Sequence, residues 1–160
     1  MKLILTSFKK NLLIFLFLIL LSSFSSLSSS KHNGVVVTRH YLATEVGSNI
    51  LLDGGNAFDA SISVAFALAV VNPSAGNIGG GGFALLYDAN KKTIESIDYR
   101  ERAPKKAKED MFLDENGNVI KGLSTSSFLA SGIPGTVDGM FMIHKKYGSI
   151  PMKKLISPAI

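Results

Sequence analysis

The sequence contains no cysteine among its 160 residues. Without cysteine the chain can form no disulfide, no zinc–thiolate site and no thiol nucleophile, so its fold must be held by an apolar core. Histidine is also scarce, and the three histidines, His32, His40 and His144, lack the close helical spacing of a metal-binding pair. We therefore expect no metal and no cofactor.

The first thirty residues have the composition of an export signal. Lys2, Lys9 and Lys10 precede an uninterrupted apolar run over residues 12–21, and serine dominates the chain from there to Ser30. A basic head, a short apolar middle and a tail of small residues are typical of a secretory signal peptide. An uncleaved membrane anchor is the alternative, but a run of about ten apolar residues is shorter than the roughly 20 that span a bilayer.

A signal peptide over residues 1–30 leaves residues 31–160 as the folded, exported part, periplasmic or secreted from a bacterium. Ser28 and Ser30 satisfy the small-residue requirement for a cut before Lys31. A competing cleavage site is formed by the earlier serines at positions 23 and 25.

Part of the positive charge belongs to this N-terminal segment. Removing residues 1–30 takes away three of the 17 basic residues and none of the 12 acidic ones, so the formal net charge falls from +5 to +2. The remaining charges form no basic stripe interleaved with aromatic residues, as nucleic-acid-binding proteins have. The cluster of Lys105, Lys106 and Lys108 is typical of a solvated surface, and we expect no nucleic-acid partner.

Apolar periodicity divides the rest of the chain into helices and strands of an α/β or α+β protein. A β-branched run at residues 35–37 predicts a buried strand. Helical spacing predicts helices over residues 41–52, 57–71 and 137–147, with another beginning between Ser149 and Pro151. A buried strand is expected over residues 83–87 and a second strand over residues 93–100, joined by a loop at residues 88–92. Residues 115–118 are expected to form a second turn.

The helix over residues 57–71 is apolar or small on nearly every side, which predicts that it is buried. Asn56 can cap its first turn. The helix should end at Asn72, because the residue before a proline is disfavoured in the α conformation.

The glycine-rich run over residues 76–82 has two interpretations. It could be an anion cradle built from unobstructed backbone N–H groups, or a place where backbones pack closely, as only glycine permits. A nucleotide site does not fit, because phosphate loops leave a strand and enter a helix, whereas this run follows a helix and precedes a strand.

Arg100 lies at the end of the expected strand 93–100. Alternation places Ser96, Asp98 and Arg100 on one face, with Ile97 and Tyr99 on the other. A planar guanidinium at a strand end is suited to bidentate capture of a carboxylate. The alternatives are an internal ion pair with Asp98 or Glu101 and a plain surface arginine.

The two histidines in the folded part do not indicate a catalytic base. His144 has core spacing in its helix, which favours a packed or hydrogen-bonded side chain, whereas His40 could have either role. No Gly-x-Ser-x-Gly nucleophile elbow accompanies them, so a serine hydrolase has little support.

Several segments between residues 43 and 160, in this order and spacing, resemble the start of the large subunit of γ-glutamyltranspeptidases (glutathione hydrolases), which belong to the N-terminal-nucleophile hydrolases. The segments are residues 54–60 (GGNAFDA), 71–83 (VNPSAGNIGGGGF), 98–101 (DYRE) with 103–104 (AP), 111–112 (MF), 132–137 (GIPGTV), 147–148 (YG) and 158–160 (PAI).

The resemblance implies a four-layer αββα sandwich, of which this chain holds only a part, and a proenzyme that cuts itself into two subunits. It implies an N-terminal threonine nucleophile on a small subunit, activated by its own α-amino group. The implied substrates are glutathione and other γ-glutamyl compounds. Water, amino acids and peptides are the implied acceptors of the γ-glutamyl group.

Only one functional residue of the family transfers to this sequence. Arg100 resembles the arginine that binds the α-carboxylate of the γ-glutamyl group, and Glu101 is expected to orient it. The glycine run resembles a structural element near the site. No catalytic residue is expected within these 160 residues, so the chain alone should be inactive. The alternatives are a related cephalosporin-type acylase and a non-catalytic remnant that binds a partner.

Overall fold

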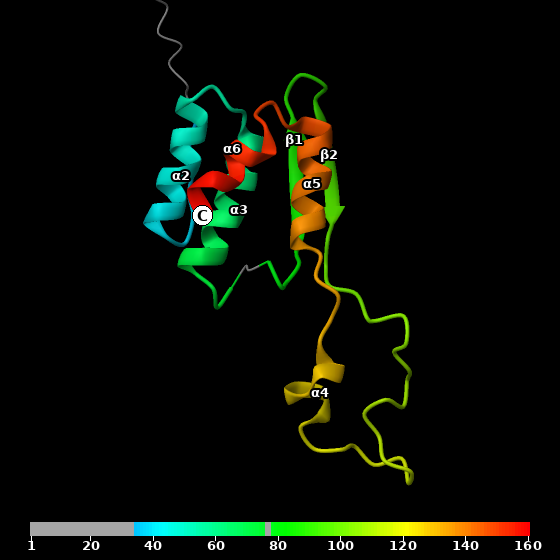
Figure 1. Ribbon diagram of the computed structural model, residues 1–160. Coiled ribbons are helices and arrows are strands. Elements are labelled where there is room, and N and C mark those ends of the chain that lie inside the picture. Colours follow the sequence, from blue (N-terminus) through cyan, green and yellow to red (C-terminus); the bar gives the residue numbers. More distant parts are fainter. Residues whose placement is uncertain (1–33, 76–77) are drawn as a thin grey trace, which may run out of the picture. The chain divides into compact units, whose positions relative to one another are not determined.

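The computed structural model describes residues 34–75 and 78–160 (Figure 1). The predicted signal peptide and the start of the glycine run lie outside the described residues. No helix in the described part is long and apolar enough to cross a bilayer. The elements, in chain order, are α2 (Tyr41–Leu52), α3 (Ala57–Val71), β1 (Phe83–Asp88), β2 (Thr93–Asp98), α4 (Leu123–Ser126), η2 (Phe128–Ala130), α5 (Thr136–Tyr147), α6 (Met152–Ile156) and η3 (Ser157–Ala159).

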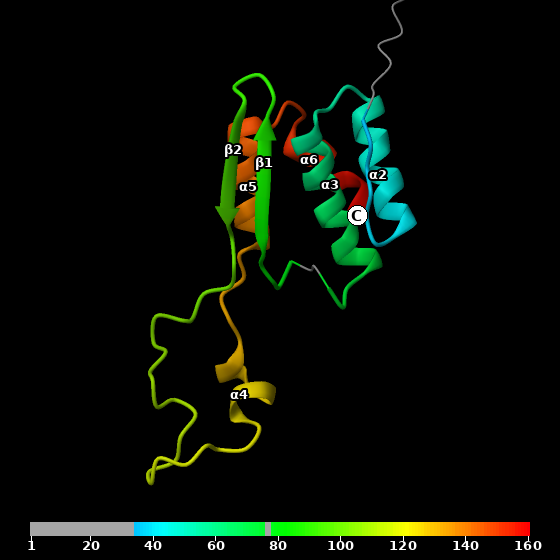
Figure 2. The ribbon, with the colours of Figure 1, turned by 180° about the vertical axis from the view of Figure 1, so that it is seen from behind.

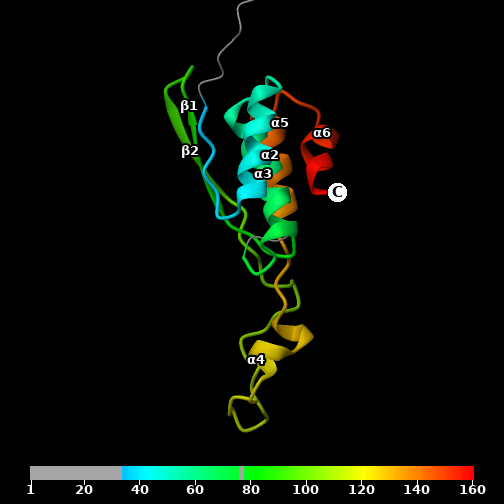
Figure 3. The ribbon, with the colours of Figure 1, turned by 90° about the vertical axis from the view of Figure 1, so that its left-hand side faces the viewer.

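The mixed fold class predicted from the sequence is confirmed. The longer helices lie on one side of a two-stranded sheet, as Figure 3 shows nearly edge-on. The described residues thus form one helical layer and one sheet layer, as part of the expected four-layer sandwich would. The core joins the layers, because Leu86 and Ile97 of the sheet belong to the same buried cluster as Ile62 of α3 and Ile143 of α5.

The sheet is an antiparallel hairpin in which Phe83 pairs with Asp98 and Asp88 pairs with Thr93. Successive side chains of a strand point to opposite faces, and here only one face is covered. The other face is turned toward the viewer in Figure 2, with α5 behind the strands. Its apolar side chains are 59–76% exposed. We call this the open face, defined by Phe83, Leu85, Tyr87 and Ile94. The predicted buried strand 83–87 is therefore buried on one face only.

Helix α3 lies in the centre of the helical layer and packs against α2, α5 and α6. Ile62 is completely buried, and the hydroxyl of Ser63 donates a hydrogen bond of 2.7 Å to the carbonyl of Leu155. Val70, in contrast, is 59% exposed. The predicted burial of α3 is confirmed for most of the helix, in which only Ala57, Ser61 and Val70 are exposed.

A capping box begins α3. The Asn56 side chain accepts a hydrogen bond of 2.9 Å from the Asp59 N–H, and the Asp59 carboxylate accepts one of 3.0 Å from the Asn56 N–H. The same carboxylate accepts a bond of 3.0 Å from the N–H of Ser149. Asp59 therefore ties the start of α3 to the turn that connects α5 with α6.

Two strand predictions need correction. Residues 35–37 form no strand, and Val35 and Val37 are 88% and 86% exposed. A strand requires a neighbour for its backbone hydrogen bonds, and none lies beside this segment in the described part of the chain. Strand β2 ends at Asp98 and not at Arg100, because beyond Asp98 only Tyr99 still pairs across the hairpin, with Gly82.

Candidate functional site

The segment that carries Arg100 is fixed by backbone pairing on both sides. Tyr99 and Gly82 exchange hydrogen bonds of 2.9 and 3.3 Å, and Arg102 and Ile133 exchange bonds of 2.8 and 3.1 Å. The second pair also closes the base of residues 103–132, which leave the fold and return to it at this point (Figure 1). Arg100 thus lies between two anchored residues.

Glycines allow this close approach. A Cβ atom on Gly81 or Gly135 would lie 2.5 or 2.0 Å from the carbonyl oxygen of Tyr99, and one on Gly139 would lie 2.4 Å from Cγ of the Tyr99 ring. The described end of the glycine run therefore packs backbone against backbone, as one of the two sequence interpretations predicted. The start of α5 joins the same unit, since the N–H groups of Gly135 and Thr136 donate to the carbonyl of Gly80.

Arg100 has the exposed position that alternation predicted, with Ile97 buried and Tyr99 half-buried on the other face. Its Nε donates a hydrogen bond of 3.2 Å to the Glu101 carboxylate, and its backbone N–H donates one of 2.9 Å to Asp98. Among the described residues, neither terminal amino group of Arg100 has a hydrogen-bond partner. The ion pair with Glu101 therefore leaves the outer fork of the guanidinium available for a planar anion such as a carboxylate.

The Glu101 carboxylate stays ionised beside this guanidinium. The pKa of Glu101 is lowered, first by a hydrogen bond from its own backbone N–H and then by the hydrogen bond from Arg100. Partial desolvation acts in the opposite direction but is outweighed. An ionised Glu101 accepts from Nε and favours one orientation of the Arg100 side chain. The structure thus brings together the two residues predicted for the site.

A small cavity of about 270 Å³ adjoins Arg100. Its walls carry charge of both signs, from Asp98, Arg100 and Arg102 at the end of the hairpin and from Asp138 of α5. Two cavities elsewhere, of about 340 and 270 Å³, are lined mainly by apolar side chains of the helical layer and the segment before α2. Of these three cavities in the described part of the chain, the one beside Arg100 is best suited to a small charged ligand.

Both described histidines have structural roles. Nε2 of His144 lies 2.7 Å from the carbonyl of Ile150, so this side chain is hydrogen-bonded in the fold, as predicted. His40 caps α2 by accepting a bond of 3.3 Å from the N–H of Leu42, which favours a hydrogen-bonded structural role over that of a base. In the described part, no cluster of His, Asp and Glu side chains could hold a metal ion.

One neighbour of Arg100 was missed by the sequence analysis. The guanidinium carbon lies 5.7 Å from the ring centroid of Phe83. Phe83 was assigned only to an apolar strand. The available signal was the hairpin register, which places Phe83 opposite Asp98 and thus close to Arg100.

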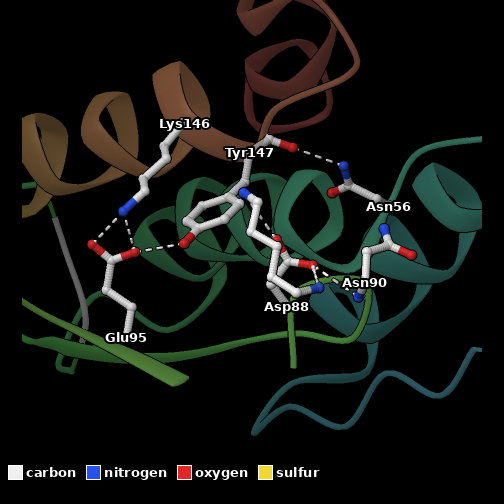
Figure 4. A network of polar contacts seen from close by, with 7 residues as sticks. Asn56, Asp88, Asn90, Glu95, Lys146 and Tyr147 are labelled. Carbon is white, nitrogen blue, oxygen red and sulfur yellow. Dashed lines mark hydrogen bonds and ion pairs between the residues drawn. The ribbon is translucent and has the colours of Figure 1, made fainter. Parts of the chain in front are cut away.

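At its other end the hairpin is tied to α5 by a polar network (Figure 4). Lys146 donates to the Glu95 carboxylate at 2.5 and 2.7 Å, and the Tyr147 hydroxyl donates to the same carboxylate. Asn56 donates a bond of 2.8 Å to the Tyr147 carbonyl. The sheet that carries Arg100 is thus held against α5 at both ends.

The comparisons with known proteins agree on one family. The family model described as gamma-glutamyltranspeptidase matches residues 43–160. The glutathione hydrolase proenzyme of Pseudomonas sp. (strain A14) is 54% identical over 129 residues, which are 80% of this chain and 22% of that protein.

Solved structures give the same result. The crystal structure of Helicobacter pylori gamma-glutamyltranspeptidase is 52% identical with a TM-score of 0.76, over 79% of this chain and 36% of that one. The cephalosporin acylase from Bacillus halodurans is more distant, at 29% identity and a TM-score of 0.65, over 74% of this chain and 21% of that one. The chain thus spans about a fifth of the length of the curated relatives it matches.

Proposed function

This chain belongs to the γ-glutamyltranspeptidase family, and from that membership we propose that it is the substrate-carboxylate-binding part of an exported glutathione hydrolase and γ-glutamyltransferase. Residues 31–160 form the N-terminal part of the large subunit. Glutathione and other γ-glutamyl compounds are the donors, and water, amino acids or peptides are the acceptors.

The geometry of Arg100 carries the proposal. Its Nε donates a hydrogen bond of 3.2 Å to Glu101, while its terminal amino groups donate none to the described residues. Two parallel N–H donors match the two oxygens of a carboxylate. Arg100 therefore binds the α-carboxylate of the γ-glutamyl group, and Glu101 orients the guanidinium.

The covalent step takes place on a residue outside this chain. The hydroxyl oxygen of the N-terminal threonine of the small subunit attacks the γ-carbonyl carbon, and its proton passes through the threonine α-amino group to the departing amine. The resulting ester is cleaved by water or by the amine of an acceptor. The contribution of this chain is to hold the donor by its α-carboxylate, so that the γ-carbonyl lies within reach of the threonine.

The first experiment is to sequence the reading frame downstream of Ile160 and to express the complete product. If the frame ends there, a hybrid is made instead, in which residues 43–160 of this chain replace the matching segment of the Helicobacter pylori enzyme. We call either protein the assembled enzyme. Release of p-nitroaniline from γ-glutamyl-p-nitroanilide is then compared for the parent, Arg100→Ala and the exposed control Arg39→Ala.

We expect activity in the parent and in Arg39→Ala, and a fall in kcat/KM of about 100-fold in Arg100→Ala, because a charged, bidentate contact contributes roughly 3 kcal/mol. Equal activity of Arg100→Ala and the parent would contradict the assignment of Arg100. A stop codon after Ile160 together with an inactive hybrid would support a non-catalytic remnant.

A cephalosporin-type acylase is the second candidate within the same fold. The greater identity to the γ-glutamyltranspeptidase structure, 52% against 29%, disfavours it. An acylase would hydrolyse a cephalosporin side-chain amide and would tolerate Arg100→Ala. The assembled enzyme is therefore assayed with γ-glutamyl-p-nitroanilide and with a cephalosporin side-chain amide.

Export depends on residues 1–30. We propose that they are a cleaved signal peptide, because their basic, apolar and small-residue zones follow in the required order. Fused to alkaline phosphatase, they should direct the reporter across the inner membrane. N-terminal sequencing of the exported reporter should find a cut before Lys31 or after Ser25, whereas an intact, membrane-bound N-terminus would identify an anchor.

A further inference from the structure

The hairpin register explains where the Arg100 side chain lies. Phe83 is opposite Asp98, and Gly82 and Tyr99 exchange both backbone hydrogen bonds. Continuing the register, Gly81 stands opposite Arg100. Since glycine has no side chain, nothing projects from that position of the neighbouring strand.

The neighbour of Arg100 on the open face is therefore the next side chain along, that of Phe83. Cross-strand and diagonal neighbours on one face of a sheet are close enough for long side chains to touch. The guanidinium carbon lies 5.7 Å from the ring centroid, within the roughly 6 Å over which a cation is attracted to an aromatic face. Phe83 is 65% exposed, so the described residues do not bury its ring.

We infer that Phe83 is a positioning residue for substrate binding, which together with Glu101 fixes the guanidinium of Arg100. Glu101 engages Nε from one side, and the Phe83 ring restricts the guanidinium from another. The two terminal amino groups are left facing a carboxylate. This inference rests on the proposed function of Arg100 and extends it to the first residue after the glycine run.

The inference also gives the glycine run a purpose. Gly81 and Gly82 permit the close approach of the two strands, and Gly81 leaves the position opposite Arg100 without a side chain. The run thus delivers Phe83 to the place where its ring meets the guanidinium. A Cβ atom at position 81 would lie 2.5 Å from the carbonyl oxygen of Tyr99 and 2.9 Å from the carbonyl carbon of Arg100, so a side chain there would push the two strands apart.

The test uses the assembled enzyme and separates KM from kcat. Phe83→Leu keeps an apolar side chain but removes the π face, so we expect KM for γ-glutamyl-p-nitroanilide to rise about 4-fold, the order expected from an exposed cation–π contact. The kcat value and the KM for the acceptor glycylglycine should stay within experimental error. Phe83→Tyr retains the π face and should restore the parent KM.

A matched control is available on the same strand. Tyr87 is also aromatic and lies on the open face at 59% exposure, but its cross-strand partner is Ile94 and not the Arg100 end of the hairpin. Tyr87→Leu should leave the donor KM unchanged.

Each outcome is decisive. Equal effects of Phe83→Leu and Tyr87→Leu, a fall in kcat with the donor KM unchanged, or a failure of Phe83→Tyr to restore the donor KM would overturn the inference while leaving the role of Arg100 intact. An inactive parent enzyme would instead overturn the proposed function, and the inference with it.

Discussion

At the residue scale, one carboxylate joins two distant parts of the chain. Asp59 is completely buried. It accepts hydrogen bonds from the backbone of Asn56, from the backbone and hydroxyl of Ser149 and from the backbone of Ile150. Burial acts to raise the pKa of Asp59, but the hydrogen bonds outweigh it and lower the pKa. The ionised form is therefore the one that the fold stabilises.

We predict that Asp59→Asn lowers the free energy of unfolding by about 2–3 kcal/mol, because hydrogen bonds to a charged group are lost and buried donors remain unsatisfied. The Asp59 pKa lies below its unfolded value, near 4, so its stabilisation is present above pH 4 and is lost as the pH falls through the folded pKa. Urea unfolding of the assembled enzyme between pH 3 and pH 8 measures the difference.

The control for Asp59 is Ser61→Ala on the exposed side of the same helix, which should change stability by less than about 0.5 kcal/mol. A difference between Asp59→Asn and the parent that grew as the pH fell would contradict the predicted sign.

A second residue-scale prediction concerns Glu101. Because the pKa of Glu101 is lowered, the ion pair with Arg100 persists as the pH falls from 8 to 5. Titration of Glu101 should therefore cause no change in the donor KM over that range. Glu101→Gln removes the charge and should raise the donor KM about 3-fold at every pH, the size expected for an exposed ion pair. Steady-state kinetics across this range test both statements, and a parent-like KM in Glu101→Gln would refute the orienting role.

These residues differ in how far the sequence could predict them. The exposed face of Arg100 followed from alternation, and Glu101 was one of two candidate partners. The link from Asp59 to Ser149 spans 90 residues of sequence, and the contact of Phe83 with Arg100 depends on the hairpin register. The link from Asp59 has no local signal, because it arises from tertiary placement, whereas the contact of Phe83 follows once the hairpin register is known.

At the element scale, α5 is held close to the Arg100 segment by the absence of a side chain at Gly139. Alanine normally stabilises a helix interior over glycine by up to about 1 kcal/mol. Here its Cβ would lie 2.4 Å from the Tyr99 ring and 2.7 Å from the Tyr99 Cβ. Steric overlap with a half-buried ring outweighs the gain in helix propensity.

We therefore predict that Gly139→Ala lowers the thermal midpoint of the assembled enzyme and raises the donor KM, since Tyr99 precedes Arg100. Overpacking of this kind costs roughly 1–3 kcal/mol. Phe141→Ala, at a site on α5 that is 48% exposed, is the control and should not change the KM. An increase in the thermal midpoint of Gly139→Ala would show that α5 can move away freely.

Elements with their own start and stop signals were predicted well. Helices α2, α3 and α5 follow from periodicity and flanking residues, and the hairpin follows from two apolar runs around a polar loop. The strand expected at residues 35–37 failed because a strand is completed by a partner. The short α4 and η2 were not predicted, since four and three residues carry no readable period.

At the scale of the whole molecule, the open face distinguishes this chain from a self-sufficient domain. Strands that are apolar on both faces are typical of sheets covered on both sides, yet Leu85 and Ile94 are 76% and 69% exposed. Family membership was predictable from ordered motifs. The open face was not, because the sequence of β1 reads as a fully buried strand.

We predict that residues 31–160 expressed alone aggregate, because large exposed apolar patches and unpaired strand edges promote association. Light scattering after purification measures this. Leu85→Lys with Ile94→Glu should increase the monomeric fraction by placing charge on the open face. A monomeric, cooperatively unfolding sample of the unsubstituted chain would contradict the prediction.

The mutual pairing of Arg102 and Ile133 has a practical consequence for engineering. Residues 103–132 begin and end at this one pair of hydrogen bonds, so their length is uncoupled from the position of Arg100. Lengthening a closed loop costs free energy only with the logarithm of its length. The exposed turn at Gly117, where φ is +81° and an added Cβ atom would meet no other atom within 4 Å, is thus a permissive point for an epitope tag or a fluorophore on the working enzyme.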